Sequence, residues 1–137
     1  MRSKNNVTIV LFACVHNAGR SQMAAAWFNR LADPATAFAI SAGTDPGPHV
    51  HPEVVAAMRE VGVDLAGAPT TRLTPEVAGR AHVLVTMGCG DQCPHVPGAE
   101  RHDWPLEDPN GKPIEKVREI RDAIRDRVRA LLERVTC

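Results

Sequence analysis

Three short segments of the chain are predominantly hydrophobic. These are residues 7–13 (VTIVLFA), 37–42 (AFAISA) and 81–87 (AHVLVTM). Apolar runs of this length are typical of strands in a parallel sheet, which is covered on both of its faces. Trp104 marks a further short strand near the end of the chain. The pattern therefore predicts four strands.

Elsewhere, apolar residues recur in steps of three and four, the period of one face of a helix. The spacing predicts helices over residues 20–31, 52–61 and 114–135, and Thr74 followed by Pro75 is a typical start of another. In the first helix, the expected buried stripe is Met23, Ala24, Trp27, Phe28 and Leu31. Strands that alternate with helices predict an α/β fold, here a single domain (residues 1–137) with a four-stranded parallel sheet and helices on both faces.

The overall composition is that of an ordinary soluble globule, with 137 residues, 44% hydrophobic content and zero formal charge. A neutral chain has no general attraction to nucleic acid or to an anionic membrane. No apolar run approaches the roughly 20 residues that span a bilayer. The basic and then apolar start has no clear signal cleavage site, so we interpret it as the first strand. We expect a cytoplasmic monomer with no nucleic-acid or membrane partner.

The four cysteines, Cys14, Cys89, Cys93 and Cys137, are too few and too unevenly spaced for a secreted disulfide framework. They are better suited to reactivity or metal binding. Cys14 and Cys89 each follow a predicted strand, so both are expected at the edge of the sheet where ligands bind in such folds. Cys137, at the end of the chain, is expected to be exposed and without a role.

The segment between the first strand and the first helix combines a thiol with groups that bind anions. Cys14 and Arg20 flank a loop that closes onto the helix N-terminus, where backbone N–H groups and the helix dipole attract anions. Arg20 can fork onto two oxygens of a tetrahedral anion. The same donors, with the Ser21 hydroxyl, favour the thiolate of Cys14, a nucleophile aimed at that anion. The expected oxyanion-binding residues are Val15, His16, Asn17, Ala18, Gly19, Arg20 and Ser21.

Other interpretations of these residues stay open. Cys14 could be a structural cysteine beside a surface arginine, and His16 either lines the pocket or is solvated. Asn17 and Gly19 are suited to a tight loop, because both tolerate unusual backbone geometry or a close approach.

The string CVHNAGRSQMA (residues 14–24) resembles the active-site loop of arsenate reductases built on the low-molecular-weight protein tyrosine phosphatase fold. The likeness continues through ISAGT, HPEVVAAMREVGVDL, VTMGCGDQCP and DWPLEDP, which covers nearly the whole chain in order. The resemblance implies that Cys14 is the nucleophile, Arg20 the oxyanion-binding arginine and Asp108 the general acid. From sequence alone, Asp108-Pro109 would be a turn. The resemblance also suggests a monovalent cation near Asn17, Ser41 and Asp64.

Arsenate reductases of this kind need a second thiol to resolve the Cys14–arsenate adduct. Cys89 and Cys93 supply two candidates for an internal relay that thioredoxin would reduce. Alternatively, mycothiol or glutathione attacks the adduct, and a redoxin such as mycoredoxin clears the product.

Two further functions remain possible on the same residues. The first is a low-molecular-weight phosphatase, against which stand Asn110 after the Asp-Pro pair and the absence of tyrosine from the sequence. The second is a zinc site formed by Cys89, Cys93, His95 and His102, although their spacing is irregular.

Overall fold

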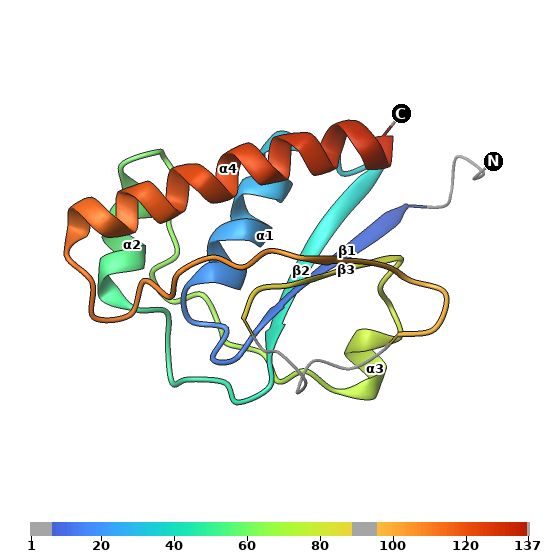
Figure 1. Cartoon of the computed structure of the whole chain (residues 1–137), viewed down its shortest axis with the longest axis horizontal. Helices are drawn as coiled ribbons and strands as arrows, with labels where there is room; N and C mark the ends of the chain where they lie inside the picture. Colours follow the sequence, from blue (N-terminus) through green and yellow to red (C-terminus); the bar gives the residue numbers. More distant parts are fainter. Residues whose placement is uncertain (1–6, 89–95, 137) are drawn as a thin grey trace.

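A parallel sheet of four strands forms the centre of the molecule (Figure 1). The computed structural model describes residues 7–88 and 96–136, and Cys89, Cys93, His95 and Cys137 lie outside these ranges. The strands are β1 (Thr8–Cys14), β2 (Ala37–Gly43), β3 (Val83–Thr86) and β4 (Glu100–Asp103), in the order β2-β1-β3-β4. The chain moves from β1 to one side and then crosses to the other. Ligands bind at such a switch point, beyond the carboxyl end of β1.

Helices cover both faces of the sheet, as the sequence predicts. They are α1 (Arg20–Leu31), α2 (Pro52–Arg59), α3 (Pro75–Ala78) and α4 (Ile114–Thr136). α4 packs across α1 and α2 on one face, and the short α3 lies on the opposite face (Figure 1). Thr74 caps α3 by accepting the Val77 N–H at 3.2 Å, which confirms the predicted start of that helix.

The two faces of β1 explain its uninterrupted hydrophobic run from Ile9 to Ala13. Val10 and Phe12 belong to the core under α1 and α4, whereas Leu11 and Ala13 belong to the smaller core under α3. All four side chains are fully buried. The Phe12 ring lies 5.5 Å from the Trp104 ring, centroid to centroid, and so joins the first strand to the end of the fourth. Alternation of face along a fully covered strand therefore produces a sequence with no polar interruption.

Two expectations about single residues need correction. Leu31, expected in the buried stripe of α1, is 40% exposed, because the stripe ends one turn earlier at Phe28. Trp104 lies just after β4 and not within it, although its N–H still donates to the Thr86 carbonyl at 2.9 Å. In the described residues, no helix is both long and apolar enough to cross a membrane.

Two arginines of α4 fasten α2 to it. Arg118 forms a forked pair with Glu60 at 2.7–3.1 Å, and Arg121 donates to Glu60 at 2.8 Å and to the Ala57 carbonyl at 2.9 Å. Hydrogen bonds from Arg118, followed by those from Arg121, lower the pKa of Glu60 to about 2. Charged pairs of this forked geometry fix orientation as well as adding attraction.

Candidate active site

Cys14 is the last residue of β1, and its side chain lies on the face of the sheet that α1 covers. Only 3% of the residue is exposed. Its Sγ lies 2.8 Å from Ser21 Oγ, in the first turn of α1. Ser21 Oγ also accepts a hydrogen bond from Asn17 Nδ2 at 2.8 Å. The thiol is thus nearly buried at the end of β1, where it borders the apolar core and contacts the Ser21 hydroxyl.

The loop after Cys14 is bent by a left-handed residue and clamped from one side. Asn17 has a φ of 50°, a conformation that asparagine tolerates better than most residues. Its buried Oδ1 accepts the Thr71 N–H at 2.8 Å. Gly43 lets the loop approach β2, because a β-carbon there would lie 2.5 Å from the Val15 carbonyl oxygen. The neighbouring segment donates to the loop through Thr44 N–H, which reaches the Cys14 carbonyl at 3.1 Å.

The backbone N–H groups of residues 15–21 have no acceptor among the described residues. These groups follow one another between the end of β1 and the first turn of α1. Successive free N–H groups at a helix N-terminus form a site for an anion, because their dipoles and that of the helix add together. The loop therefore has the donors that a tetrahedral oxyanion requires.

Arg20 is the first residue of α1, and its guanidinium is largely buried, with 12% of the side chain exposed. Nη1 donates to the Leu106 carbonyl at 3.0 Å, and Nη2 lies 3.8 Å from Asp108 Oδ2. Gly88, with a φ of 98°, leaves room for this group, since a β-carbon there would collide with Arg20 Nη1. The arginine is thus confined between the end of the third strand and the loop that follows the fourth.

Asp108 lies at the rim of the site, with about half of its side chain exposed. Its Oδ1 accepts the Asn110 N–H at 3.0 Å, which is the turn expected of an Asp-Pro pair. Pro109 is buried against the loop, because a β-carbon on Gly19 would lie 2.9 Å from Pro109 Cγ. Gly19 therefore permits close approach, and this contact docks the Asp108 turn onto the Cys14 loop.

Other expected site residues lie apart from this centre. His16 is exposed and its Nδ1 lies 2.9 Å from the Asp45 carbonyl oxygen. Asp64 is also exposed, and its Oδ1 accepts the Ala66 N–H and lies 3.5 Å from Arg59 Nη2. In the described part of the chain, no hydrogen bond joins Asp64 to Asn17 or Ser41, so a cation held by these three residues stays a prediction.

The thiol relay and most of the zinc alternative fall outside the described ranges. Of the four zinc candidates only His102 is described, and its Nε2 lies 2.7 Å from Glu100 Oε2. Within the described ranges, residues 7–88 and 96–136, no group of three His, Cys, Asp or Glu side chains could hold a metal ion.

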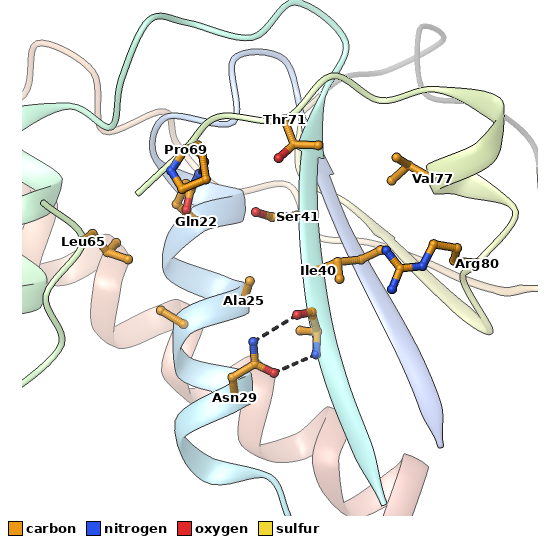
Figure 2. Close-up of a pocket in the computed structure, with 12 residues that line it drawn as sticks. Gln22, Ala25, Asn29, Ile40, Ser41, Leu65, Pro69, Thr71, Val77 and Arg80 are labelled. Atoms are coloured by element: carbon orange, nitrogen blue, oxygen red, sulfur yellow. Dashed lines mark hydrogen bonds between the residues drawn. The ribbon is translucent and has the colours of Figure 1, made fainter. Parts of the chain in front are cut away.

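A groove of about 520 Å³ runs along the free edge of β2, between α1 and the segment that leads to α3 (Figure 2). Asn29 closes one part of that edge by pairing with both backbone groups of Ala39, at 2.7 and 3.0 Å. Gln22 lines the groove near Pro69 and Thr71. Gln22 is 7% exposed and donates to Asn17. The sequence pattern gave no reason to expect this burial or this contact of a polar residue on a helix.

Together, a parallel α/β sheet and a Cys–Arg oxyanion loop at its carboxyl edge define a class of phosphatase-like proteins. The chain belongs to the low molecular weight phosphotyrosine protein phosphatase family, whose model matches residues 9–137. A relative from Halobacterium salinarum is 38% identical over 132 residues, which are 92% of each chain. The glutaredoxin arsenate reductase of Synechocystis is 32% identical over 130 residues, covering 93% of this chain and 98% of the relative.

Solved structures give the same family and fold. The thioredoxin-dependent arsenate reductase of Corynebacterium glutamicum superposes with a TM-score of 0.82 and 39% identity. The match covers 95% of this chain and 62% of that one, so the protein spans less than two thirds of this relative's length.

Proposed function

We propose that the protein is an arsenate reductase that converts arsenate to arsenite through Cys14. The observation that carries the proposal is the position of the Cys14 thiol at the base of a loop whose backbone N–H groups have no protein acceptor in the described chain. Such a loop fits a tetrahedral oxyanion with its central atom facing the sulfur. The arsenate reductase names of relatives that match over most of this chain support the choice of arsenic.

In the first step, the Cys14 thiolate attacks the arsenic of bound arsenate. A sulfur–arsenic bond forms, one arsenic–oxygen bond breaks, and the oxygen leaves as water after taking up protons. The loop N–H groups and Arg20 stabilise the oxyanion as charge develops on it, which is commonly the largest contribution to such reactions. Asp108 supplies a proton to the leaving oxygen, a role worth roughly 10²–10⁴-fold in rate.

In the second step, another thiolate attacks Cys14 Sγ. A disulfide forms and the sulfur–arsenic bond breaks with its electron pair left on arsenic, so that As(V) becomes As(III) and arsenite departs. Cys89 and Cys93 are the internal candidates, and mycothiol or glutathione is the external alternative. An external thiol system, thioredoxin or mycoredoxin, then reduces the disulfide. A relative described as thioredoxin-dependent supports the first of these.

Separate Cys89→Ser and Cys93→Ser variants distinguish the two routes. With thioredoxin as the only donor, an internal relay requires that at least one of these variants loses turnover. Loss of turnover with thioredoxin but not with mycothiol and mycoredoxin would assign the relay, whereas full turnover of both variants with thioredoxin would contradict it. Peptide mass mapping after a single turnover then identifies which sulfur is joined to Cys14.

A phosphatase is the second candidate, because the family description and the Cys14–Arg20–Asp108 arrangement serve phosphoryl transfer equally well. Little aromatic surface is available near Asp108 for a phenyl ring. Trp104, four residues earlier, is buried and its ring packs on Phe12. Purified protein is tested with arsenate and, separately, with an aryl phosphate. Turnover of the aryl phosphate alone would establish the phosphatase instead.

The remaining parts of the proposal concern the cellular location, oligomeric state, ligands and bound cation of the enzyme. We place it in the cytoplasm as a monomer, with arsenate as substrate and phosphate or sulfate as mimics. A monovalent cation near Asn17, Ser41 and Asp64 would stabilise the loop. Titration of the reductase with K⁺ in a Na⁺-free and K⁺-free buffer tests the cation, and unchanged activity and melting temperature would dismiss it.

A further inference from the structure

Gln22 lies on the groove side of the Cys14 loop, and its contacts converge on one loop residue. Its Nε2 donates to the Pro69 carbonyl at 2.9 Å, to the Asn17 carbonyl at 3.1 Å and to Asn17 Oδ1 at 3.3 Å. Figure 2 shows the Gln22 side chain beside Pro69 at the edge of the groove. Because backbone carbonyls only accept, the Gln22 amide must present its NH₂ group to all three oxygens.

The Gln22 amide and the Thr71 N–H together fix the orientation of the Asn17 amide. Asn17 Oδ1 receives the Gln22 NH₂ and also the Thr71 backbone N–H, which can only donate. The oxygen of the Asn17 amide is therefore turned toward these donors, and its NH₂ is turned toward Ser21. Asn17 is fully buried, so no solvent competes for either end of this amide.

The orientation of Asn17 in turn fixes the proton of Ser21. Ser21 Oγ accepts from Asn17 Nδ2 at 2.8 Å and lies 2.8 Å from Cys14 Sγ, and when Cys14 is a thiolate only the Ser21 hydrogen can be the donor between them. A hydroxyl that donates to sulfur stabilises a thiolate, whereas one that accepts from sulfur stabilises a thiol. The direction of this last hydrogen bond therefore affects the reactivity of Cys14.

We propose that Gln22 is a positioning residue of the reaction, which orients the Ser21 hydroxyl onto the Cys14 thiolate through the amide of Asn17. The inference deepens the proposed function and rests on it for its biological meaning. Gln22 touches neither the thiol nor the oxyanion donors. It acts by holding the carbonyl ends of Asn17, and it also ties the loop to the Pro69 segment.

The test is the rate at which iodoacetamide alkylates Cys14, measured by mass mapping of its peptide in the full-length protein. Gln22→Met keeps the side-chain volume but removes the donors. We expect its Cys14 alkylation at pH 7 to fall about tenfold, the size expected when a hydrogen bond to a charged group is lost. The alkylation rate should recover at higher pH, because the thiol is then deprotonated without the stabilising hydrogen bond from Ser21.

Asn29→Leu is the matched control. Asn29 is on the same helix and lines the same groove, and its amide also makes two backbone hydrogen bonds, but these go to Ala39 and not to the loop. We expect Asn29→Leu to lose stability and to alkylate within twofold of the wild type. Equal slowing in both variants, or no slowing in Gln22→Met, would overturn the proposal.

A double variant keeps the test decisive if Gln22→Met folds poorly. A Ser21→Ala background already breaks the hydrogen-bond chain from Gln22 through Asn17 to Cys14. In that background the isosteric Gln22→Glu should slow alkylation by less than twofold. Slowing of tenfold in that background would show that Gln22 acts by another route. Arsenate turnover is measured in parallel on the wild type. If turnover is absent while the alkylation pattern holds, the proposed function fails and the role of Gln22 stands.

Discussion

Replacement of Gly88 by alanine should weaken oxyanion binding by moving Arg20. The β-carbon of an alanine at this position would collide with Arg20 Nη1 and lie 3.1 Å from its Cζ. The guanidinium would have to leave its place against the Leu106 carbonyl, where Nη1 now donates at 3.0 Å. In the proposed site, a displaced arginine would no longer present its fork of donors to an oxyanion bound above Cys14.

The size of the effect follows from the bonds at risk. A hydrogen bond that involves a charged group contributes roughly 1.5–3 kcal/mol. At about 1.4 kcal/mol for each factor of ten, loss of one such bond raises the Kd for phosphate by roughly 10- to 150-fold. The positive φ of Gly88 adds backbone strain of roughly 1–3 kcal/mol to an alanine, but this lowers the free energy of unfolding and not the affinity.

Gly98→Ala separates the two contributions. Gly98 has a φ of 83°, close to the 98° of Gly88, and a β-carbon there would meet nothing within 4 Å. Calorimetric titration with phosphate should give nearly wild-type affinity for Gly98→Ala and a much higher Kd for Gly88→Ala. Chemical unfolding should show a similar loss of stability in both. If the two variants bind phosphate equally well, Gly88 does not set the position of Arg20.

Three further predictions concern other contacts. Asp108→Asn should lower kcat for arsenate by roughly 10²–10⁴-fold with the Kd for phosphate little changed, because the proposed proton donor is lost and the loop is kept. Steady-state kinetics and calorimetry check this. Gly19→Ala should push Pro109 away, since its β-carbon would lie 2.9 Å from Pro109 Cγ, and should lower kcat by roughly tenfold or more, though by less than Asp108→Asn. The pKa of Glu60 falls from 4.5 to about 2 on folding, so as the pH is lowered the unfolded chain binds a proton at Glu60 before the folded protein does. The stability that the carboxylate adds above pH 4.5 is therefore lost as the pH falls toward 2. Melting temperatures between pH 5 and pH 2 should fall less steeply in Glu60→Gln than in the wild type, and parallel curves would contradict this.

Helices and strands with a clear pattern of hydrophobic residues were predictable from the sequence. The helix at residues 20–31 begins and ends as predicted, because its start is fixed by the loop after Cys14 and its end by Asp33-Pro34. The sheet also follows from the apolar runs, since runs this short are typical of strands covered on both faces. Local sequence therefore determines where Cys14 and Arg20 sit relative to one another.

Contacts between distant loops were not predictable in this way. The Arg20 guanidinium is held by a carbonyl 86 residues later, and Gln22 reaches one 47 residues later. Backbone carbonyls carry no side-chain signature, and a glutamine on a helix is usually a solvated residue. These partners exist only because packing of the sheet brings the loops together.

The most direct test of the whole account is the state of Cys14 after a single turnover with arsenate. Reduced protein is mixed with one equivalent of arsenate, quenched with acid and mapped by mass spectrometry while arsenite is counted. The account predicts one arsenite released for each disulfide formed, which joins Cys14 to a chain cysteine or an added thiol, or joins Cys89 to Cys93 if the internal relay has gone on to regenerate Cys14. Arsenite released with no disulfide formed, or released equally by Cys14→Ser, would contradict it.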